Sequence, residues 1–226
     1  MNKAFHGSLI KKKGEEQKKL HLLSLLLIGF LFLHFLILMY CILDDCANTV
    51  KPFRKRCDTC LAKAELVICL DIDETLVSSN MEGKWFGSVI PDHVLTFRET
   101  LYKRPHLDYF LQQVFAKYVV CVWSAGTRPY IQDVVKCIFT KKQQEDLEIV
   151  VDAEHPFAFD RKKCLARITS VYTILIDDSQ MNLDVNPPNQ RCHVSAFTHP
   201  PSQRNDRQLL FLLDWLAEVA NAKRQT

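Results

Sequence analysis

Beyond residue 64, five largely apolar runs each have the length of a strand. They occupy residues 65–71, 118–124, 147–153, 171–178 and 191–197. Apolar runs without regular polar alternation are typical of parallel strands that are buried on both faces. The pattern therefore predicts one central, mostly parallel β-sheet.

Segments with helical spacing lie between or after these runs. Residues 106–117, 128–139 and 205–220 repeat apolar positions every three or four residues, which favours amphipathic helices. In the last segment Asn205 or Asp206 can cap the helix. Its expected buried face consists of Leu209, Leu213, Leu216 and Ala220.

Residues 93–105 alternate apolar and polar positions instead, which predicts a hairpin or an edge strand. Elsewhere strands and helices follow each other in turn, and this order predicts an α/β fold. We expect a doubly wound, mostly parallel sheet over residues 65–220.

Residues 22–43 contain no Asp, Glu, Lys or Arg and are almost entirely apolar. About 20 helical residues cross the hydrocarbon core of a bilayer, so a transmembrane or membrane-anchoring helix is predicted over residues 20–43. A core helix would keep a polar stripe, and a signal peptide has an apolar stretch of only ~7–15 residues. We expect a basic tail over residues 1–19 and a polar linker over residues 44–64.

Charge is divided unevenly along the chain. Residues 1–63 contain 11 Lys or Arg and 5 Asp or Glu, whereas residues 64–226 contain 18 and 21. The folded part is therefore slightly acidic, which argues against direct nucleic-acid binding. Both flanks of the membrane segment are basic, so charge does not fix its orientation. The odd number of cysteines in the folded part and the absence of any glycosylation sequon favour the cytosol or nucleoplasm.

Polar residues of one kind end three of the predicted strands. The sequences ICLDID, CVWSAGT and ILIDDS place Asp71, Asp73, Ser124, Asp177 and Asp178 at strand ends. The carboxyl ends of parallel strands form one edge, where such sheets bind ligands. Strand ends are often polar because loops are exposed to solvent, but solvent exposure alone does not readily explain two carboxylate pairs and a hydroxyl at the same edge.

Such a cluster suits phosphate chemistry. Four carboxylates this close cannot all be ionised without a compensating cation, and oxygen ligands together with phosphate point to Mg²⁺. One carboxylate can attack phosphorus to form an aspartyl-phosphate, while a second protonates the leaving oxygen and then activates water. Ser124 and a lysine would bind the phosphoryl oxygens.

The segment DIDETLV, residues 71–77, resembles the first motif, DxDx(T/V), of the haloacid dehalogenase superfamily. The wider pattern resembles its small C-terminal-domain phosphatase branch, which includes NLI-interacting-factor-like and Dullard phosphatases. The segments LYKRPHLDYFL, CVWSAGTRPYIQDVV, RKKCLARI and ILIDDSQ follow in the order of that branch's motifs. The resemblance covers about residues 65–220.

The resemblance implies roles for the acidic residues. Asp71 would be the nucleophile and a magnesium ligand. Asp73 would be the general acid and base, with its backbone carbonyl on the metal. Asp177 and Asp178 would complete the magnesium site.

The resemblance also implies how phosphate is bound. Ser124 would replace the family's threonine as the phosphate-binding hydroxyl. Lys163 would neutralise the phosphoryl group, with Lys162 as the alternative. Two departures, Gln180 in place of proline and Gly126 with Thr127 in place of Ser-Leu, change the loops without removing a chemical group.

We therefore predict a membrane-anchored, Mg²⁺-dependent protein serine/threonine phosphatase, with phosphoserine and phosphothreonine proteins as substrates and the endoplasmic reticulum or nuclear envelope as its membrane. A non-catalytic membrane scaffold of the same fold is one alternative, but such relatives usually lose part of the catalytic set. A small-molecule phosphatase is the other, but those enzymes commonly carry a cap domain. Only 25 residues lie between Val77 and Lys103, and 35 between Thr127 and Lys163, so we expect no large cap.

Overall fold

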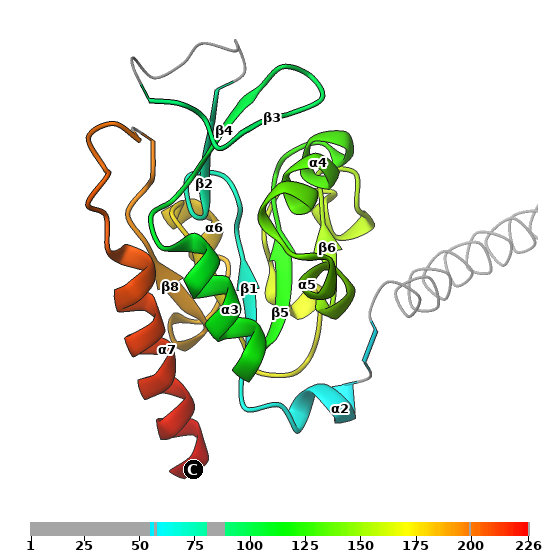
Figure 1. Ribbon diagram of the computed structural model, residues 1–226. Helices are drawn as coiled ribbons and strands as arrows, with labels where there is room; N and C mark the ends of the chain where they lie inside the picture. Colours follow the sequence, from blue (N-terminus) through cyan, green and yellow to red (C-terminus); the bar gives the residue numbers. More distant parts are fainter. Residues whose placement is uncertain (1–54, 57, 81–88, 199, 226) are drawn as a thin grey trace, which may run out of the picture. The chain divides into compact units, whose positions relative to one another are not determined.

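The computed structural model (Figure 1) describes residues 55–56, 58–80, 89–198 and 200–225. The predicted basic tail and membrane segment, residues 1–19 and 20–43, lie outside the described residues, as does most of the predicted linker. Among the helices that are described, none has the length and apolar character needed to cross a bilayer.

A five-stranded sheet forms the centre of the described domain. Its order is β6 (Val150–Val151), β5 (Val119–Trp123), β1 (Val67–Leu70), β7 (Thr173–Asp177) and β8 (Arg191–His193). All four neighbouring pairs are parallel. The prediction of an α/β fold with a mostly parallel sheet is confirmed, and each of the five runs contains a strand.

Strand order explains where a site can form. The chain passes from β1 outward to β5 and β6, then returns to β7 on the other side of β1. The order reverses at β1 and β7, and the carboxyl ends of strands at such a reversal are the usual binding position in doubly wound sheets.

Helices α3 (Leu107–Lys117) and α7 (Gln208–Gln225) lie side by side across one face of the sheet (Figure 1). Alternate strand residues such as Ile68 and Ile174 belong to the same buried cluster as Leu111 of α3. That cluster also contains α4 (Arg128–Ile138), whose buried side chains are Ile131, Val134 and Ile138. The apolar stripes predicted for the three helices therefore face the sheet.

The buried face of α7 differs from the expected face at one position. Leu212 is buried, together with the expected Leu209, Leu216 and Ala220, whereas Leu213 is only partly buried. Residues three and four positions after Leu209 both satisfy helical spacing, so the spacing alone does not decide which of the two is buried.

A second, antiparallel sheet lies between β1 and α3 in the chain. It has the order β2 (Val77–Asn80), β4 (Thr100–Lys103) and β3 (His93–Val94), and the predicted hairpin over residues 93–105 is confirmed. No further domain is inserted between Ser124 and Lys163, a stretch that is described throughout. The remaining helices are short: α2 (Asp58–Ala62), α5 (Lys141–Asp146), α6 (Gln180–Leu183), η2 (Pro156–Ala158), η3 (Leu165–Arg167) and η4 (Pro188–Gln190).

Arg104, which follows β4, connects the loop after β1 and the segment after β8 to the start of α7. Its buried guanidinium donates to the Thr75 carbonyl at 3.0 Å, to the Ser195 carbonyl at 2.8 Å and to Asp206 Oδ2 at 2.8 Å. Asp206 Oδ1 also accepts from the Gln208 amide at 2.7 Å, as expected of a residue that caps α7. The buried, charged side chain of Arg104 therefore fixes the loop that follows β1 through a hydrogen bond to its backbone.

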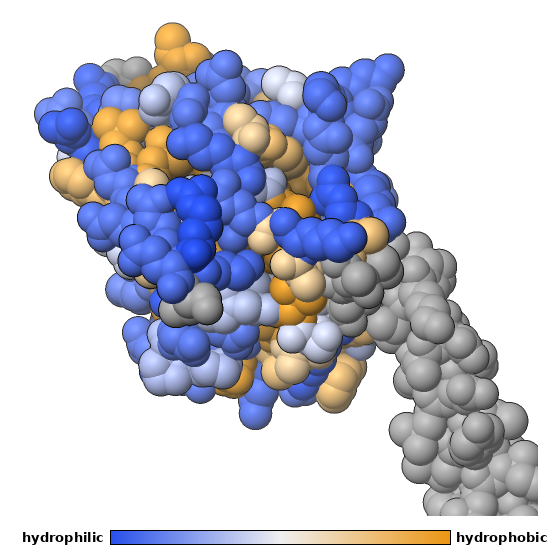
Figure 2. All heavy atoms as spheres, turned by 90° about the horizontal axis from the view of Figure 1, so that it is seen from below, coloured by the Kyte–Doolittle hydropathy of each residue, from blue (hydrophilic) through white to orange (hydrophobic). Residues whose placement is uncertain are grey.

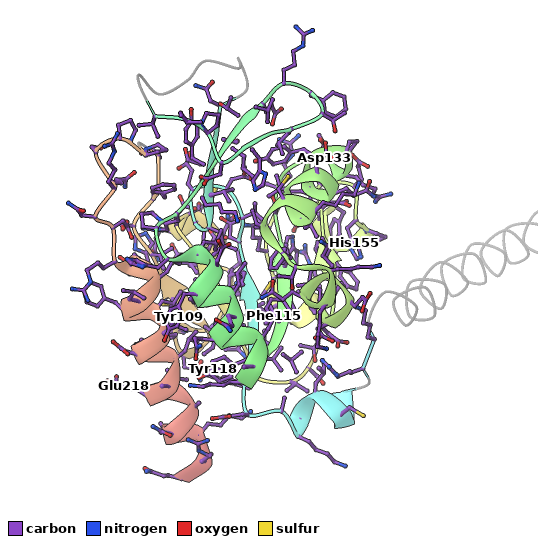
Figure 3. All side chains as sticks on the ribbon, in the orientation of Figure 1. Tyr109, Phe115, Tyr118, Asp133, His155 and Glu218 are labelled. Atoms are coloured by element: carbon purple, nitrogen blue, oxygen red, sulfur yellow. The ribbon has the colours of Figure 1, made fainter. Side chains whose placement is uncertain are left out.

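Side chains of the helices complete the core. Phe115 of α3 (Figure 3) packs edge to face against Phe139 beyond the end of α4, with ring centroids 5.8 Å apart. Polar side chains cover most of the described surface seen in Figure 2, and apolar side chains appear there in separate areas. Within the described part of the chain, the large apolar side chains that stay exposed are Ile90, Val94, Phe97, Tyr109, Phe159, Met181 and Phe211.

Candidate functional site

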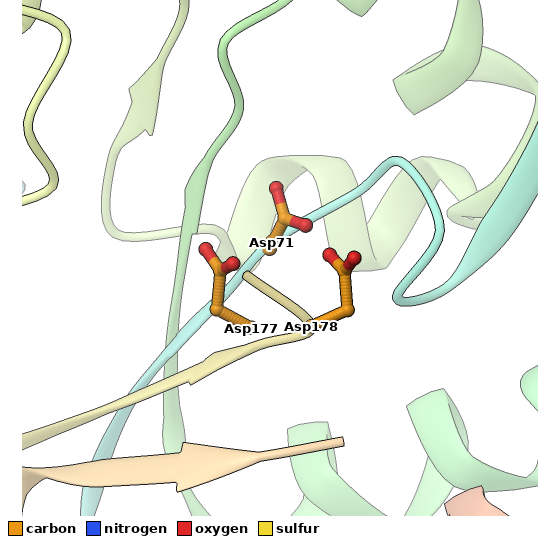
Figure 4. Close-up of side chains that lie close together, drawn as sticks. All are labelled: Asp71, Asp177 and Asp178. Atoms are coloured by element: carbon orange, nitrogen blue, oxygen red, sulfur yellow. The ribbon is translucent and has the colours of Figure 1, made fainter. Parts of the chain in front are cut away.

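Three carboxylates meet at the carboxyl ends of β1 and β7 (Figure 4). Asp71 directly follows β1, Asp177 ends β7, and Asp178 comes next. One oxygen of each lies within 4.8 Å of the others, with Asp71 and Asp177 buried and Asp178 partly exposed. The two strands bring them together because they pair in parallel, with Leu70 opposite Ile176.

Lys163 supplies positive charge to this group. Its Nζ atom donates to Asp71 Oδ1 at 2.5 Å and to Asp177 Oδ2 at 2.7 Å, and its side chain is buried. The Asn186 side chain donates to the Lys163 carbonyl at 2.8 Å and so holds the backbone at this point. The alternative lysine, Lys162, is exposed and makes none of these contacts.

Asp73 lies beside the three carboxylates and has its own partners. Its Oδ2 atom accepts from Ser124 Oγ at 3.1 Å, and its Oδ1 atom accepts from the Tyr130 hydroxyl. Ser124 directly follows β5, is fully buried and accepts from the Gly126 amide at 2.9 Å. The carboxylate of Asp73 is thus oriented by two hydroxyl groups.

The Tyr130 ring packs against Gly126, where the absence of a side chain provides the space that the ring occupies. A Cβ atom at residue 126 would be 2.7 Å from Tyr130 Cδ1 and 2.9 Å from Ile131 Cδ1, which is closer than van der Waals contact allows. The departure from the resembled motif at Gly126 therefore has a local physical reason, because a larger residue would displace the tyrosine that contacts Asp73.

Thr75 connects the carboxylates across the loop after β1. Its Oγ1 atom donates to Asp71 Oδ2 at 2.9 Å, accepts from the Asp178 amide at 3.2 Å and lies 3.3 Å from Asp178 Oδ1. On the other side, the Asn182 side-chain Nδ2 donates to Asp177 Oδ1 at 3.1 Å. These contacts satisfy carboxylate oxygens that burial would otherwise leave unpaired.

Burial and charge change the proton affinities in the site. Burial raises the pKa of the Asp71 carboxyl; Lys163 lowers it, and the nearby Asp177 raises it again. Burial also raises the pKa of Asp73, although hydrogen bonds from Tyr130 and Ser124 act in the opposite direction. Burial alone would lower the pKa of Lys163, but the charges of Asp71 and Asp177 outweigh it and raise that pKa. Lys163 is therefore a cation at neutral pH.

The donor set fits a hard divalent cation. Asp71, Asp177 and Asp178 offer only oxygen atoms, which Mg²⁺ prefers. When Asp71, Asp177 and Asp178 are all ionised, the single ammonium group of Lys163 leaves an excess of two negative charges. The Asp73 carboxylate is not part of this group, so a contribution of Asp73 to the metal would have to come from its backbone carbonyl.

Three residues of the site had no role in the sequence-based prediction. Thr75 and Tyr130 lie within the motif segments, and the threonine of DIDET was a signal that a hydroxyl lies beside Asp71. Asn182 follows the last acidic pair by four residues, and no pattern in the sequence distinguishes it from a surface residue.

A comparison with protein-family models matches residues 66–225 to the NLI interacting factor-like phosphatases. Two curated relatives are similar to the same region. Nuclear envelope morphology protein 1 of Schizosaccharomyces pombe is 30% identical over 160 residues, covering 66% of this chain and 32% of the relative. Putative CTD phosphatase-like protein 355R of Invertebrate iridescent virus 3 is 27% identical over 170 residues, covering 64% of this chain and 91% of the relative.

The chain thus spans about a third of the length of the yeast relative and most of the viral one. Among solved structures, Fcp1, an essential RNA polymerase II CTD phosphatase, aligns with 16% sequence identity and a TM-score of 0.49. That alignment covers 74% of this chain and 54% of the Fcp1 chain.

Proposed function

The chain belongs to the NLI interacting factor-like phosphatase family, and we propose that it is a membrane-anchored, Mg²⁺-dependent phosphatase of phosphoserine and phosphothreonine in proteins. One observation carries the proposal. The buried Asp71 carboxylate contacts Lys163 within a group of three carboxylates, at the point where the strand order reverses. A nucleophile, a fixed cation and a set of oxygen ligands are the components that phosphoryl transfer through an aspartyl-phosphate requires.

In this proposal Asp71 attacks the phosphorus atom and takes the phosphoryl group. Asp73 first gives a proton to the leaving serine or threonine oxygen and then removes one from the water that releases phosphate. Lys163 and the Ser124 hydroxyl bind the phosphoryl oxygens as negative charge develops on them. Mg²⁺ bound by Asp71, Asp177 and Asp178 would neutralise the phosphate and polarise it.

The alternatives explain fewer features of the site. A non-catalytic scaffold has no need for a lysine buried against two carboxylates, an arrangement that costs desolvation energy. A small-molecule phosphatase usually closes over its substrate, whereas the described stretch between Ser124 and Lys163 contains no inserted domain. A site without an inserted domain in this described stretch suits an extended protein segment.

Phosphate release from a substrate panel tests the function. With Mg²⁺, the full chain in detergent should hydrolyse phosphoserine and phosphothreonine peptides with a kcat/KM at least about tenfold above that for sugar phosphates and nucleotides. That ratio corresponds to about 1.4 kcal/mol of additional binding in the transition state. Equal or higher values for the small metabolites would support a small-molecule phosphatase. No release from any compound would support the scaffold.

Removing the Tyr130 hydroxyl should alter the acid and base step. The Tyr130→Phe variant leaves Asp73 with one hydroxyl partner, so the pKa of Asp73 should rise further. Because protonated Asp73 is needed for leaving-group departure, the descending high-pH limb of kcat/KM should move to higher pH. Turnover should fall by roughly 10-fold, since the carboxylate is less well oriented.

The measurement is a pH profile on one phosphopeptide. Tyr172→Phe is the matched control because the Tyr172 hydroxyl donates to the Asn189 carbonyl, away from the site. It should leave the profile unchanged. A profile for Tyr130→Phe that coincides with the wild-type profile would show that Tyr130 does not position Asp73.

We also propose that residues 20–43 anchor the chain in the endoplasmic reticulum or nuclear envelope, with the folded domain on the cytosolic or nucleoplasmic side. The length and apolar character of the segment support the anchor, and the name of the yeast relative is consistent with the membrane. The chain should resist alkaline extraction from membranes, and deletion of residues 20–43 should release it. Protease should remove a C-terminal epitope from intact microsomes, whereas protection until detergent is added would contradict the topology.

A further inference from the structure

A cavity of about 400 Å³ lies next to the candidate site, at the carboxyl ends of β5 and β6. Ser124 and Lys163 belong to its lining, so the cavity begins where phosphate is proposed to bind. Other parts of its wall are formed by Ala125, Ala153 and Ala158, whose small side chains leave the space open. A substrate whose phosphoryl group is held by Ser124 and Lys163 would place its adjoining atoms at this cavity.

Phe159 gives the cavity an apolar wall. Its side chain is 77% exposed although it is large and aromatic. The guanidinium carbon of Arg167 lies 4.3 Å from the ring centroid, and Arg167 is fixed by hydrogen bonds of 2.5 and 2.7 Å to Asp160. The ring is therefore held in position while most of its surface stays in contact with solvent, so a ligand in the cavity can pack against it.

Arg161 gives the same cavity a positive charge. Nearby arginines are neutralised, since Arg128 pairs with Asp152 at 2.9 Å and Arg167 with Asp160. Within the described part of the chain no ion pair is found for Arg161, which is exposed and has a left-handed backbone with φ of 59°. The cavity thus combines an apolar ring, an uncompensated cation and two residues proposed to bind phosphate.

We propose that this cavity is a specificity subsite for the peptide segment beside the phosphoresidue. It accepts an apolar side chain against Phe159 and an anionic side chain, either a carboxylate or a second phosphate, against Arg161. The inference rests on the proposed phosphatase function and specifies its substrate class: phosphoproteins with an apolar and an acidic residue next to the phosphorylated serine or threonine.

Peptide binding to the inactive full chain tests the subsite independently of turnover. The full chain carrying Asp71→Asn, in detergent with Mg²⁺, is titrated into fluorescent phosphoserine peptides, and anisotropy gives the Kd. The parent peptide has a leucine and a glutamate beside the phosphoserine. Three further peptides replace the leucine with alanine, the glutamate with glutamine, or the glutamate with a second phosphoserine.

The leucine should tighten binding roughly tenfold, and the glutamate roughly three- to fivefold. Adding Phe159→Ala should remove the difference between the leucine and alanine peptides. Adding Arg161→Gln should remove the difference between the glutamate and glutamine peptides. Lys162→Gln, at an exposed cation outside the cavity lining, is the matched control and should preserve both differences.

The outcomes separate the subsite from the catalytic proposal. Tighter binding of the doubly phosphorylated peptide than of the parent would identify a second phosphate as the preferred anion, and the reverse would identify a carboxylate. The proposed subsite is contradicted if the Phe159→Ala chain still prefers the leucine peptide and the Arg161→Gln chain still prefers the glutamate peptide. It is also contradicted if no peptide binds. If binding follows the expected pattern but the chain with Asp71 intact releases no phosphate, the subsite stands and the proposed catalytic function fails.

Discussion

The Asp71→Asn chain is expected to lose phosphate release by a factor on the order of 10³ or more while remaining folded. The amide has almost the same volume as the carboxylate but cannot attack phosphorus. Its oxygen can still accept from Lys163, and the Thr75 hydroxyl can rotate to accept from the new NH₂ group. Lys163 also keeps its contact with Asp177. Phosphate release from a phosphopeptide, together with thermal unfolding, measures both parts of the expectation.

Asp184→Asn is the matched control for the change of carboxylate to amide. Asp184 is exposed, follows α6 and pairs with Arg191 at 2.5 Å, outside the carboxylate group. Its loss should leave turnover within about twofold, since exposed ion pairs contribute little. Near-normal turnover in Asp71→Asn would exclude Asp71 as the nucleophile.

Removal of divalent metal should abolish turnover almost as completely. Three carboxylates with a single lysine leave the site too negative for a phosphate dianion to approach. We expect a chelator to reduce turnover by roughly 10²-fold or more, and Mg²⁺ in excess of the chelator to restore it. A binding measurement should agree, because an ion that binds only the folded chain stabilises it by about 2.7 kcal/mol at one hundred times its Kd.

The stabilisation also locates the metal. Mg²⁺ should raise the Tm of the wild-type chain, and Asp178→Asn should weaken this shift because it removes one of the three ligands. The Asp184→Asn control should keep it. Full activity in excess chelator, or better activity with Zn²⁺ than with Mg²⁺, would contradict the assignment of a magnesium site.

Apolar runs were sufficient to predict the strands because parallel strands buried on both faces have a simple signature. They did not define strand ends. Residues 147–153 contain only the two-residue strand β6, Val150–Val151, although backbone hydrogen bonds to β5 begin at Glu148, whose amide donates to the Val120 carbonyl at 2.9 Å. Leu147 and Ile149 are buried although they lie outside the assigned strand, and the Ile149 carbonyl accepts from the Val122 amide of β5 at 2.9 Å.

The acidic part of the site could be predicted because carboxylates are unusual at the ends of buried strands. The lysine was harder, since Lys162 and Lys163 are adjacent and both are preceded by a basic residue. The contact that holds the backbone at Lys163 comes from Asn186, which is 23 positions away in the chain. The contact between Tyr130 and Asp73 likewise depends on the space left by Gly126, which is a property of the packed structure.

The most direct test of the central claim is to locate the phosphoryl group during turnover. The chain is mixed with a ³²P-labelled phosphopeptide, quenched in acid within one turnover, and digested for mapping. We expect label that is stable in acid and released by mild base, on the peptide that contains Asp71, and no label in the Asp71→Asn chain. Label on another residue, or rapid phosphate release with no labelled intermediate in the wild-type chain, would contradict an aspartyl-phosphate at Asp71.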